Sequence, residues 1–315
     1  MSVLRIAFVF PGQGSQKVGM LTAAHERFQV VRDTFAEASQ ALGYDMWDLI
    51  QNGEQEALNL TETTQPVLLT ASVALWRAWL DQNGPRPVMM AGHSLGEFSA
   101  MVCAGALDFA DAVQLVRQRG AFMQTAVPVG EGAMAAIIGL DDDVINTICS
   151  KASADSGLVV AAVNYNSPGQ VVIAGHTRAI EDAIGLLKDA GAKRALPLPV
   201  SAPFHTELMR PAGEKLAEVL EGLSIRAPEI PVVHNVHART EREPQGIRGL
   251  LVEQIYSPVL WTGCVQAMAE SGCTTIVECG PGKVLSGLGR RIDKSLQCYS
   301  IEEPAELLAT LEACS

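Results

Sequence analysis

The chain has 315 residues, 48% of them hydrophobic and 18% charged, and its formal net charge at pH 7 is −12. This composition supports a large buried core, in one domain or in two. The acidic balance argues against a general nucleic-acid-binding protein, because neutralising phosphates requires a basic surface. The apolar runs are short, and the first one, Ile6 to Phe10, stops at Pro11-Gly12. We therefore expect no signal peptide, no membrane-spanning helix and a cytoplasmic location.

The cysteines predict neither a disulfide framework nor a metal site. They are odd in number, widely spaced and free of any Cys-x-x-Cys pair, whereas disulfide scaffolds and structural zinc sites use paired cysteines. We expect reduced, buried thiols. The seven are Cys103, Cys149, Cys264, Cys273, Cys279, Cys298 and Cys314.

The N-terminal segment predicts a buried strand over residues 4 to 10, followed by the glycine-rich turn Pro11-Gly12-Gln13-Gly14-Ser15-Gln16. A dinucleotide-binding loop is one interpretation, but Lys17 occupies the place of the third glycine in that fingerprint. Gly282-Lys283 is followed by Val284, so the sequence contains no Walker loop there. A non-catalytic nucleotide-binding module is therefore a disfavoured alternative.

Two helices and a short strand are expected next. Apolar residues recur at spacings of three and four from Phe28 to Leu42, which is typical of an amphipathic helix. A second helix is predicted to open at Gln65-Pro66, with the proline in its first turn, and to run through Leu80. Gly84-Pro85 ends it, and the apolar run Val88 to Ala91 predicts a strand.

The motif Gly92-His93-Ser94-Leu95-Gly96 lies between this strand and an apolar, helix-compatible run from Phe98 to Leu107. A Gly-x-Ser-x-Gly in that position is the pattern of a nucleophile elbow, in which the serine stands on a sharp turn. The glycines relieve crowding in the turn, and the first N–H groups of the helix, beginning with Leu95, face negative charge on an attacked carbonyl. Ser94 is therefore a candidate nucleophile for acyl chemistry. A plain turn serine is the alternative.

The next helix, capped by Asp108 and lasting to about Thr125, carries a candidate anion-binding residue. Every member of its core-facing seam except Arg119 is small or apolar. A guanidinium on such a seam needs an anion, either from the protein or from a substrate. An arginine that reaches water along its stem, or an internal ion pair, is the alternative. The seam consists of Phe109, Ala112, Val116, Arg119, Met123 and Ala126.

The middle of the chain predicts a small unit of its own. Its elements follow the order strand, helix, strand, strand, helix, strand, at 133–140, 142–153, 158–163, 170–174, 177–190 and 194–200. This βαββαβ order is that of a ferredoxin-like unit. We therefore predict an inserted ferredoxin-like subdomain at 128–202, bounded near Val127-Pro128 and Ser201-Pro203. Residues 1–127 and 203–315 would form one α/β body.

The last part of the chain supplies a candidate base. His205 lies at the seam where the inserted unit rejoins the body, just ahead of a helix expected at about 207–223. Because clefts form between domains, we choose His205 among the six histidines as the base for Ser94. A solvated histidine at a helix N-terminus is the alternative. The further elements expected are strands at 231–233 and 275–277 and helices at 247–256, at 259–270 and after 282.

No acidic residue between Ser94 and His205 stands out as the third member of a catalytic triad. A Ser-His pair oriented by a group other than a carboxylate is therefore the simplest interpretation, and a backbone carbonyl would suffice. Gln13, in the turn after the first strand, is a candidate for an oxyanion-hole loop, because its flanking glycines let backbone N–H groups point inwards. The same residues would serve any tight turn between a strand and a helix.

Taken together, these motifs resemble the acyltransferase family of fatty acid and polyketide synthesis, in particular its malonyl-CoA:acyl carrier protein transacylases. The resemblance covers nearly the whole chain in order. The residues that carry it are Pro11 to Gln16, Gly92 to Glu97, Arg119-Gly120, Asn164 to Gln170, Pro203-Phe204-His205, Gln254 to Trp261 and Glu278 to Gly282.

The resemblance implies an α/β-hydrolase-like body with the ferredoxin-like unit inserted, and a cleft between them. It implies that Ser94 is the nucleophile and His205 its base, held by the main-chain carbonyl of Gln254 in place of an acid. It also implies that the N–H groups of Gln13 and Leu95 hold the oxyanion.

The resemblance further implies that Arg119 pairs with the free carboxylate of a malonyl group. The implied activity is ping-pong transfer of malonyl from malonyl-CoA to the phosphopantetheine thiol of acyl carrier protein, for fatty acid synthesis. It implies no cofactor beyond the coenzyme A thioester used as substrate. We expect a monomer that binds neither nucleic acid nor membrane. The alternatives are a stand-alone acyltransferase of a polyketide pathway and a serine esterase or thioesterase, which would use water as acceptor.

Carrier proteins of this kind are acidic, so we expect a local basic rim despite the acidic whole. Scattered solvated charges are the alternative. The candidates are Lys283, Arg290, Arg291 and Lys294, with Lys193 and Arg194 as a second group.

Overall fold

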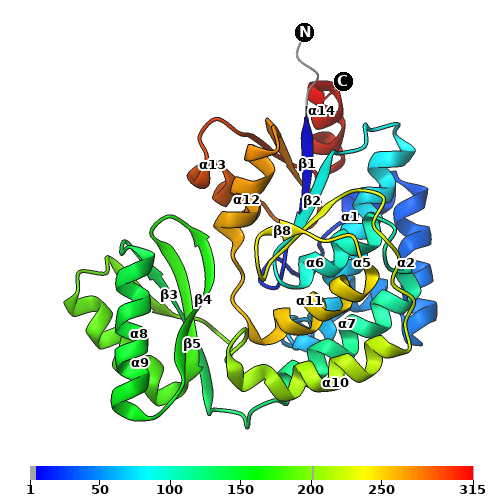
Figure 1. The fold of residues 1–315 in the computed structure, drawn as a ribbon. Coiled ribbons are helices and arrows are strands. Elements are labelled where there is room, and N and C mark those ends of the chain that lie inside the picture. Colours follow the sequence, from blue (N-terminus) through cyan, green and yellow to red (C-terminus); the bar gives the residue numbers. More distant parts are fainter. Residues whose placement is uncertain (1–4, 201, 315) are drawn as a thin grey trace.

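The computed structural model describes residues 5 to 200 and 202 to 314 and contains two β-sheets (Figure 1). The larger sheet has the strand order β10-β9-β1-β2-β7-β8. Its neighbours pair in parallel, except that β8 is antiparallel to β7. The strands are β1 (Ile6–Phe10), β2 (Met89–Gly92), β7 (Val232–His234), β8 (Arg239–Thr240), β9 (Thr275–Glu278) and β10 (Gln297–Ser300). Leu4, the first residue of the strand predicted at 4–10, lies outside the described residues.

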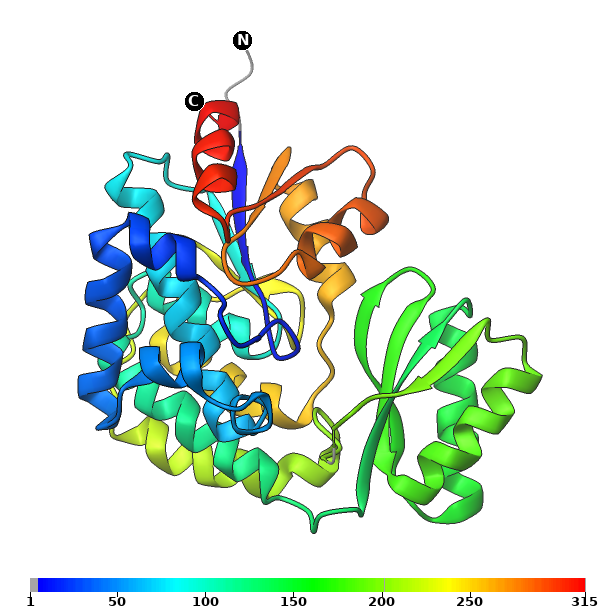
Figure 2. The same ribbon diagram turned by 180° about the vertical axis from the view of Figure 1, so that it is seen from behind.

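Helices cover both faces of this sheet, as the two opposite views show (Figure 1 and Figure 2). The first half of the body contributes α1 (Thr22–Arg27), α2 (Gln29–Leu42), α3 (Met46–Asn52), α4 (Gln55–Leu58), α5 (Thr61–Asp81), α6 (Leu95–Cys103) and α7 (Phe109–Gln124). The second half contributes α10 (Arg210–Glu221), α11 (Pro244–Glu253), α12 (Trp261–Glu270), α13 (Val284–Ile292), α14 (Pro304–Cys314) and the short 3-10 helices η1 (Glu207–Met209) and η2 (Gln254–Tyr256).

The central strand β1 is apolar throughout because both of its faces are covered. All of its residues are buried. Phe8 points to the side of α5, where Trp76 and Trp79 each meet its ring edge-on at 5.2 Å between centroids. Ala7 and Val9 belong to a second core cluster that includes residues of α12 and α13. The continuous apolar run in the sequence thus reflects a strand between two helical layers.

The start of α5 was predicted wrongly. The helix begins at Thr61, so Pro66 lies inside it and not in its first turn. The N–H groups of Thr63 and Thr64 already bond to the carbonyl of Leu60, so the first turn forms upstream of the proline. A proline inside a helix removes a hydrogen bond and crowds the carbonyl four residues earlier, and the buried packing of this region offsets both costs.

The smaller sheet has the strand order β4-β5-β3-β6, with antiparallel pairing throughout. Its elements are β3 (Gly132–Ile138), α8 (Asp142–Ser156), β4 (Val160–Ser167), β5 (Gln170–His176), α9 (Thr177–Asp189) and β6 (Arg194–Pro197). They follow one another in the predicted order and enclose a separate hydrophobic cluster. The hairpin between β4 and β5 turns on Pro168-Gly169 alone, shorter than the predicted turn, and Gly169 has φ +72°. Ser201, at the predicted subdomain boundary, lies outside the described residues.

The smaller sheet is joined to the body through β4. The N–H of Tyr165 donates to the carbonyl of Val259 at 3.0 Å, and the N–H of Val259 donates to the carbonyl of Val163 at 2.7 Å. The hydroxyl of Thr262, in α12, donates to the carbonyl of Tyr165 at 3.0 Å. Val259, in the segment before α12, therefore forms a single parallel bridge with Asn164 of β4.

Within residues 5–200 and 202–314, no helix is long and apolar enough to cross a bilayer. The same described residues hold no group of three or more His, Cys, Asp or Glu side chains arranged to bind a metal ion. All seven cysteines are free, and all but Cys103 are buried.

Candidate active site

Ser94 stands on a strained turn between β2 and α6. Its backbone has φ 51° and ψ −110°, a conformation that non-glycine residues rarely adopt. A Cβ at Gly92 would lie 1.9 Å from the carbonyl carbon of Gly96, and a Cβ at Gly96 would lie 2.0 Å from the carbonyl oxygen of Phe10. Only glycine fits at either position. The two glycines of the motif are therefore required by close backbone packing, which holds Ser94 just beyond the carboxyl end of β2.

Ser94 and His205 are hydrogen-bonded, with 2.8 Å between Oγ and Nε2. On the other side of the ring, Nδ1 lies 2.8 Å from the carbonyl oxygen of Gln254. A carbonyl only accepts, so Nδ1 carries the proton and Nε2 is left as the acceptor for the Ser94 hydroxyl. The ring is thus oriented by a backbone carbonyl, as a base for this serine requires.

His205 is buried, with 4% of its surface exposed, so the alternative of a solvated histidine is wrong. Burial, together with the positive charge of Arg119, lowers the pKa of His205 to about 3. The hydrogen bond to the Gln254 carbonyl opposes this shift. The imidazole is therefore neutral at physiological pH, with Nε2 free of a proton.

Arg119 reaches the same place from α7, and it is 1% exposed. Its Nη1 donates to Oε1 of Gln65 at 2.8 Å, and its Nη2 donates to Oε1 of Gln254 at 2.7 Å and to Oγ of Ser94 at 3.4 Å. Burial lowers the pKa of Arg119 to about 9, which leaves the guanidinium charged at pH 7. Both strong acceptors are neutral amides, so a cation without a directly bound anion stands next to the candidate nucleophile.

The turns that carry Gln13 and Leu95 follow the carboxyl ends of two neighbouring strands, β1 and β2. β1 and β2 are parallel, with Phe10 opposite Gly92, so the turns after both strands begin side by side. Leu95 is the first residue of α6, and its N–H is among the donors that a helix leaves without an intrahelical acceptor. Gly12 approaches the elbow closely, because a Cβ there would lie 2.6 Å from the carbonyl oxygen of His93. The turns that carry Gln13 and Leu95 are therefore neighbours, and the oxyanion role of their N–H groups stays a prediction.

A family profile described as "Acyl transferase domain" matches residues 7–308. This chain belongs to that acyl transferase family. It is 58% identical over 308 residues to "Malonyl CoA-acyl carrier protein transacylase" of Escherichia coli K12, covering 98% of this chain and 99% of that relative. The protein of the same name from Bacillus subtilis is 46% identical, covering 95% of this chain and 94% of that relative.

Two solved structures of acyl transferases are similar to it as well. An acyl carrier protein S-malonyltransferase from Vibrio cholerae has a TM-score of 0.95 and 54% identity, covering 97% of this chain and 99% of that one. A malonyl-transacylase in complex with a type II PKS acyl-carrier protein has a TM-score of 0.96 and 52% identity, covering 98% and 99%. At this identity and coverage, the mixed α/β fold with two sheets is that of the acyl transferase family.

Sequence reasoning missed three polar residues beneath the candidate site. Asn235, after β7, accepts from the N–H of Ser94 at 2.8 Å and donates to the carbonyl of Gly92 at 2.7 Å, so it braces the elbow. Glu97 is buried in α6, and His234 donates to it from Nδ1 at 2.7 Å. A signal was available for Glu97, because it is a charged residue in an otherwise small and apolar helix. The same signal singled out Arg119.

The remaining histidines are engaged elsewhere. His93 Nε2 lies 2.8 Å from Oδ1 of Asn166, which ties the elbow to β4. His25 stacks on Trp47 with 3.6 Å between ring centroids. His176 accepts from the N–H of Val159 at 3.0 Å. Of the histidines, it is His205 that the structure brings to Ser94.

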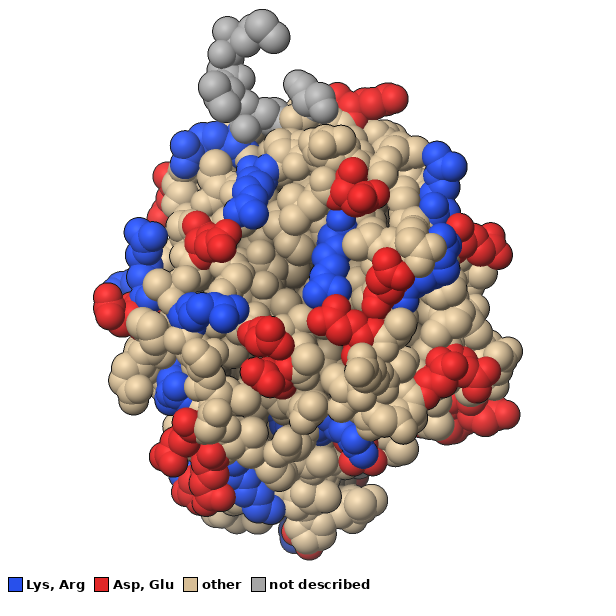
Figure 3. Space-filling model, turned by 90° about the vertical axis from the view of Figure 1, so that its right-hand side faces the viewer, with Lys and Arg blue, Asp and Glu red and all other residues tan. Residues whose placement is uncertain are grey.

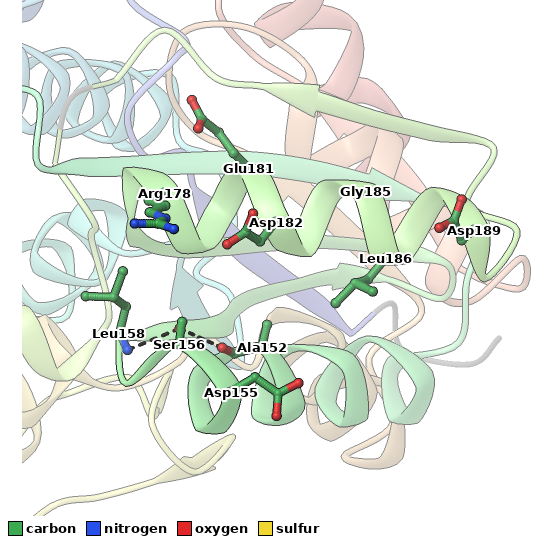
Figure 4. Close-up of a pocket in the computed structure, with 10 residues that line it drawn as sticks. All are labelled: Ala152, Asp155, Ser156, Leu158, Arg178, Glu181, Asp182, Gly185, Leu186 and Asp189. Atoms are coloured by element: carbon green, nitrogen blue, oxygen red, sulfur yellow. Dashed lines mark hydrogen bonds between the residues drawn. The ribbon is translucent and has the colours of Figure 1, made fainter.

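A groove between α8 and α9 lies apart from this site (Figure 4). None of the residues that line it takes part in the contacts around Ser94. Carboxylates there would repel the phosphates of coenzyme A, so it does not compete as a substrate site. Its acidic side chains are Asp155, Glu181, Asp182 and Asp189, with Arg178 as the single cation of the lining.

Proposed function

We propose that the protein transfers the malonyl group of malonyl-CoA to the phosphopantetheine thiol of an acyl carrier protein, through a covalent malonyl ester on Ser94. The observation that carries this proposal is the buried cation Arg119, with Nη2 3.4 Å from the Oγ of a serine that is hydrogen-bonded to a neutral histidine. A nucleophile and a carboxylate receptor at one point suit an acyl group with a free carboxylate. The names of the relatives agree with this activity.

The chemistry follows from the hydrogen bonds. His205 Nε2 takes the hydroxyl proton as Ser94 Oγ attacks the thioester carbonyl, and the N–H groups of Gln13 and Leu95 stabilise the oxyanion. When the tetrahedral intermediate collapses, the C–S bond breaks and His205 returns the proton to the departing sulfur, so that coenzyme A leaves as the thiol. The carrier's thiol then gives its proton to His205 as its sulfur attacks the ester carbonyl. His205 passes that proton to Ser94 Oγ as the serine leaves. The Gln254 carbonyl stabilises the imidazolium formed in each half-reaction.

Arg119 supplies selectivity in this proposal. The carboxylate of a malonyl group forms a charge-assisted pair with the guanidinium, whereas an acetyl group leaves the buried cation without an anion. A site built for a charged group rejects the analogue that lacks it more strongly than an apolar pocket rejects a missing methylene. We therefore assign Arg119 to malonyl recognition.

The carrier protein would meet the basic residues predicted from the sequence. Arg290 and Arg291 occupy the last turn of α13, and Nη1 of Arg291 donates to Oε1 of Gln170 at 2.7 Å, next to the β4–β5 turn. Lys283 is paired with Glu306, which reduces its value as a docking cation. The face on the side of α2 carries interspersed basic and acidic side chains and offers no basic surface of this kind (Figure 3). We propose the α13 side for carrier docking.

We also infer that residues 128–202 form a ferredoxin-like insertion in an α/β-hydrolase-like body made of 1–127 and 203–315. The antiparallel order β4-β5-β3-β6 and its separate core support the insertion, and the central parallel strands of the larger sheet support the body. The same proposal includes a cytoplasmic monomer that needs no cofactor beyond the thioester substrate.

Intact mass spectrometry after exposure to malonyl-CoA, followed by peptide mapping, tests the function. We expect one malonyl group on Ser94, transferred to holo acyl carrier protein on its addition. Ser94→Ala should abolish the adduct, while Ser99→Ala, a change at another serine near the elbow, should retain it. An adduct in Ser94→Ala would refute the assignment, and rapid steady hydrolysis without carrier would indicate an esterase.

The polyketide alternative rests on one comparison. A 52% identical malonyl-transacylase is described in complex with a type II PKS acyl-carrier protein. Comparing kcat/KM for a fatty-acid carrier and a polyketide carrier distinguishes the two pathways, and a preference for the latter would assign the protein to polyketide assembly.

A further inference from the structure

A buried carboxylate that the acyl-transfer steps do not use lies directly beneath the site. Glu97 is fully buried on the first turn of α6, three residues after Ser94. Its Oε1 accepts from Nδ1 of His234 at 2.7 Å, and its Oε2 accepts from the N–H of Asn235 at 3.0 Å and from Nε2 of Gln254 at 2.9 Å. The two carboxylate oxygens of Glu97 thus accept three hydrogen bonds from buried groups of the body.

The contact with Gln254 links this anion to Arg119. The Gln254 amide donates from Nε2 to Glu97 and to the carbonyl of Ser94 at 2.9 Å, and its Oε1 accepts from Arg119 at 2.7 Å. A flipped amide would set its N–H groups against the guanidinium and its oxygen against the carboxylate. Glu97 and the Ser94 carbonyl therefore dictate which end of the amide faces Arg119.

Charge gives a second reason for the link. Burial disfavours the charged form of Arg119, and the negative charge of Glu97 opposes that effect on the Arg119 pKa. The Gln254 amide lies between the two groups, so the Glu97 carboxylate favours the charged form of Arg119 without accepting a hydrogen bond from it. A direct ion pair would instead occupy N–H donors that a substrate carboxylate could use.

We propose that Glu97 is a positioning residue for acyl-group selectivity, which sets the orientation of the Gln254 amide and thereby holds Arg119 charged and correctly placed for a substrate carboxylate. This inference rests on the proposed malonyl transfer and deepens it. It predicts that Glu97 affects substrates with a free carboxylate far more than substrates without one.

The test compares Glu97→Gln with the unmodified protein, using kcat/KM for malonyl-CoA and for acetyl-CoA. The glutamine keeps the volume but loses the charge and sets an amide N–H against neighbouring donors. We expect the ratio of the two kcat/KM values to fall by about tenfold or more, the effect of one hydrogen bond to a charged group. An unchanged ratio, with both substrates slowed equally, would overturn the proposal and leave Glu97 a structural role.

Glu278→Gln is the matched control. Glu278 is another fully buried carboxylate, and it accepts from the N–H groups of Leu285 and Ser286 at 3.1 and 2.7 Å at the start of α13. Its replacement should lower the melting temperature without changing the malonyl-to-acetyl ratio. A matching loss of selectivity in this control would show that any buried carboxylate matters, and would also overturn the proposal.

Gln254→Met gives an independent route if Glu97→Gln does not fold. It removes the amide but keeps the backbone carbonyl that orients His205. We expect a similar loss of malonyl preference. The double variant with Glu97→Gln should show no further loss, because both changes break the same link between Glu97 and Arg119. Retained preference in Gln254→Met, or additive losses, would contradict the link. Failure of the unmodified protein to form the malonyl adduct would instead refute the proposed function, so the two failures are distinguishable.

Discussion

Replacing Arg119 with alanine should reverse the choice between malonyl and acetyl groups. The guanidinium is 1% exposed, and its two short contacts are to the side chains of Gln65 and Gln254, which are neutral. In the unmodified protein, acetyl-CoA leaves this cation buried and unpaired. In the variant, it is the malonyl carboxylate that is left unpaired. Acetyl transfer should therefore be retained while malonyl transfer falls.

The magnitude follows from the burial. Removing one partner of a buried, hydrogen-bonded charge pair costs about 2 to 5 kcal/mol. With about 1.36 kcal/mol for each factor of ten, the malonyl-to-acetyl ratio of kcat/KM should fall by about thirtyfold to several thousandfold.

The assay is a competition between equal concentrations of malonyl-CoA and acetyl-CoA, with the two Ser94 adducts resolved by mass. Arg117→Ala is the control, because Arg117 lies on the same helix with its side chain exposed. If the folded Arg119→Ala protein kept the original preference, Arg119 would have only a structural role and the reasoning on selectivity would be wrong.

Three further predictions concern the base, the elbow and a helix cap. Burial and Arg119 lower the pKa of His205 to about 3, so the rate at which a neutral activated ester acylates the protein should not fall around pH 6.5. Arg119→Ala should move the acid limb of this pH–rate profile to higher pH. An acid limb near pH 6.5 in the unmodified protein would contradict the reasoning. Gly92→Ala should lower the free energy of unfolding by about 3 kcal/mol or more, because its Cβ would lie 1.9 Å from the carbonyl carbon of Gly96. An unchanged midpoint of urea unfolding would show that the turn relaxes to accommodate the methyl group. Asp108→Ala should cost about 1 kcal/mol in the same measurement, because it removes the acceptor for two N–H groups at the start of α7, and it should leave transfer rates unchanged.

Local patterns predicted the elements that depend on local forces. The βαββαβ order appears between Gly132 and Pro197, because alternation of apolar residues and a tight Pro-Gly turn suffice to specify strands and hairpins. The short elements α1, α3, α4, β8, β10 and α14 were not predicted. Most of them are too short for a period to show, and they are held in place by packing against neighbours. The start of α5 was missed for the same reason, since tertiary packing tolerates Pro66 inside the helix.

The sequence by itself determined the chemistry available at the site. Glycines around Ser94, a lone arginine on an apolar seam and a histidine at a chain boundary are recognisable because each breaks a local pattern. Only the tertiary structure decided how these residues meet: Ser94 lies 2.8 Å from His205, and the Gln254 side chain joins Glu97 to Arg119. These contacts link positions more than a hundred residues apart, and hydrogen bonds between distant segments leave no spacing or periodicity in the chain. Their geometry is set by sheet order and helix packing, which depend on the whole core.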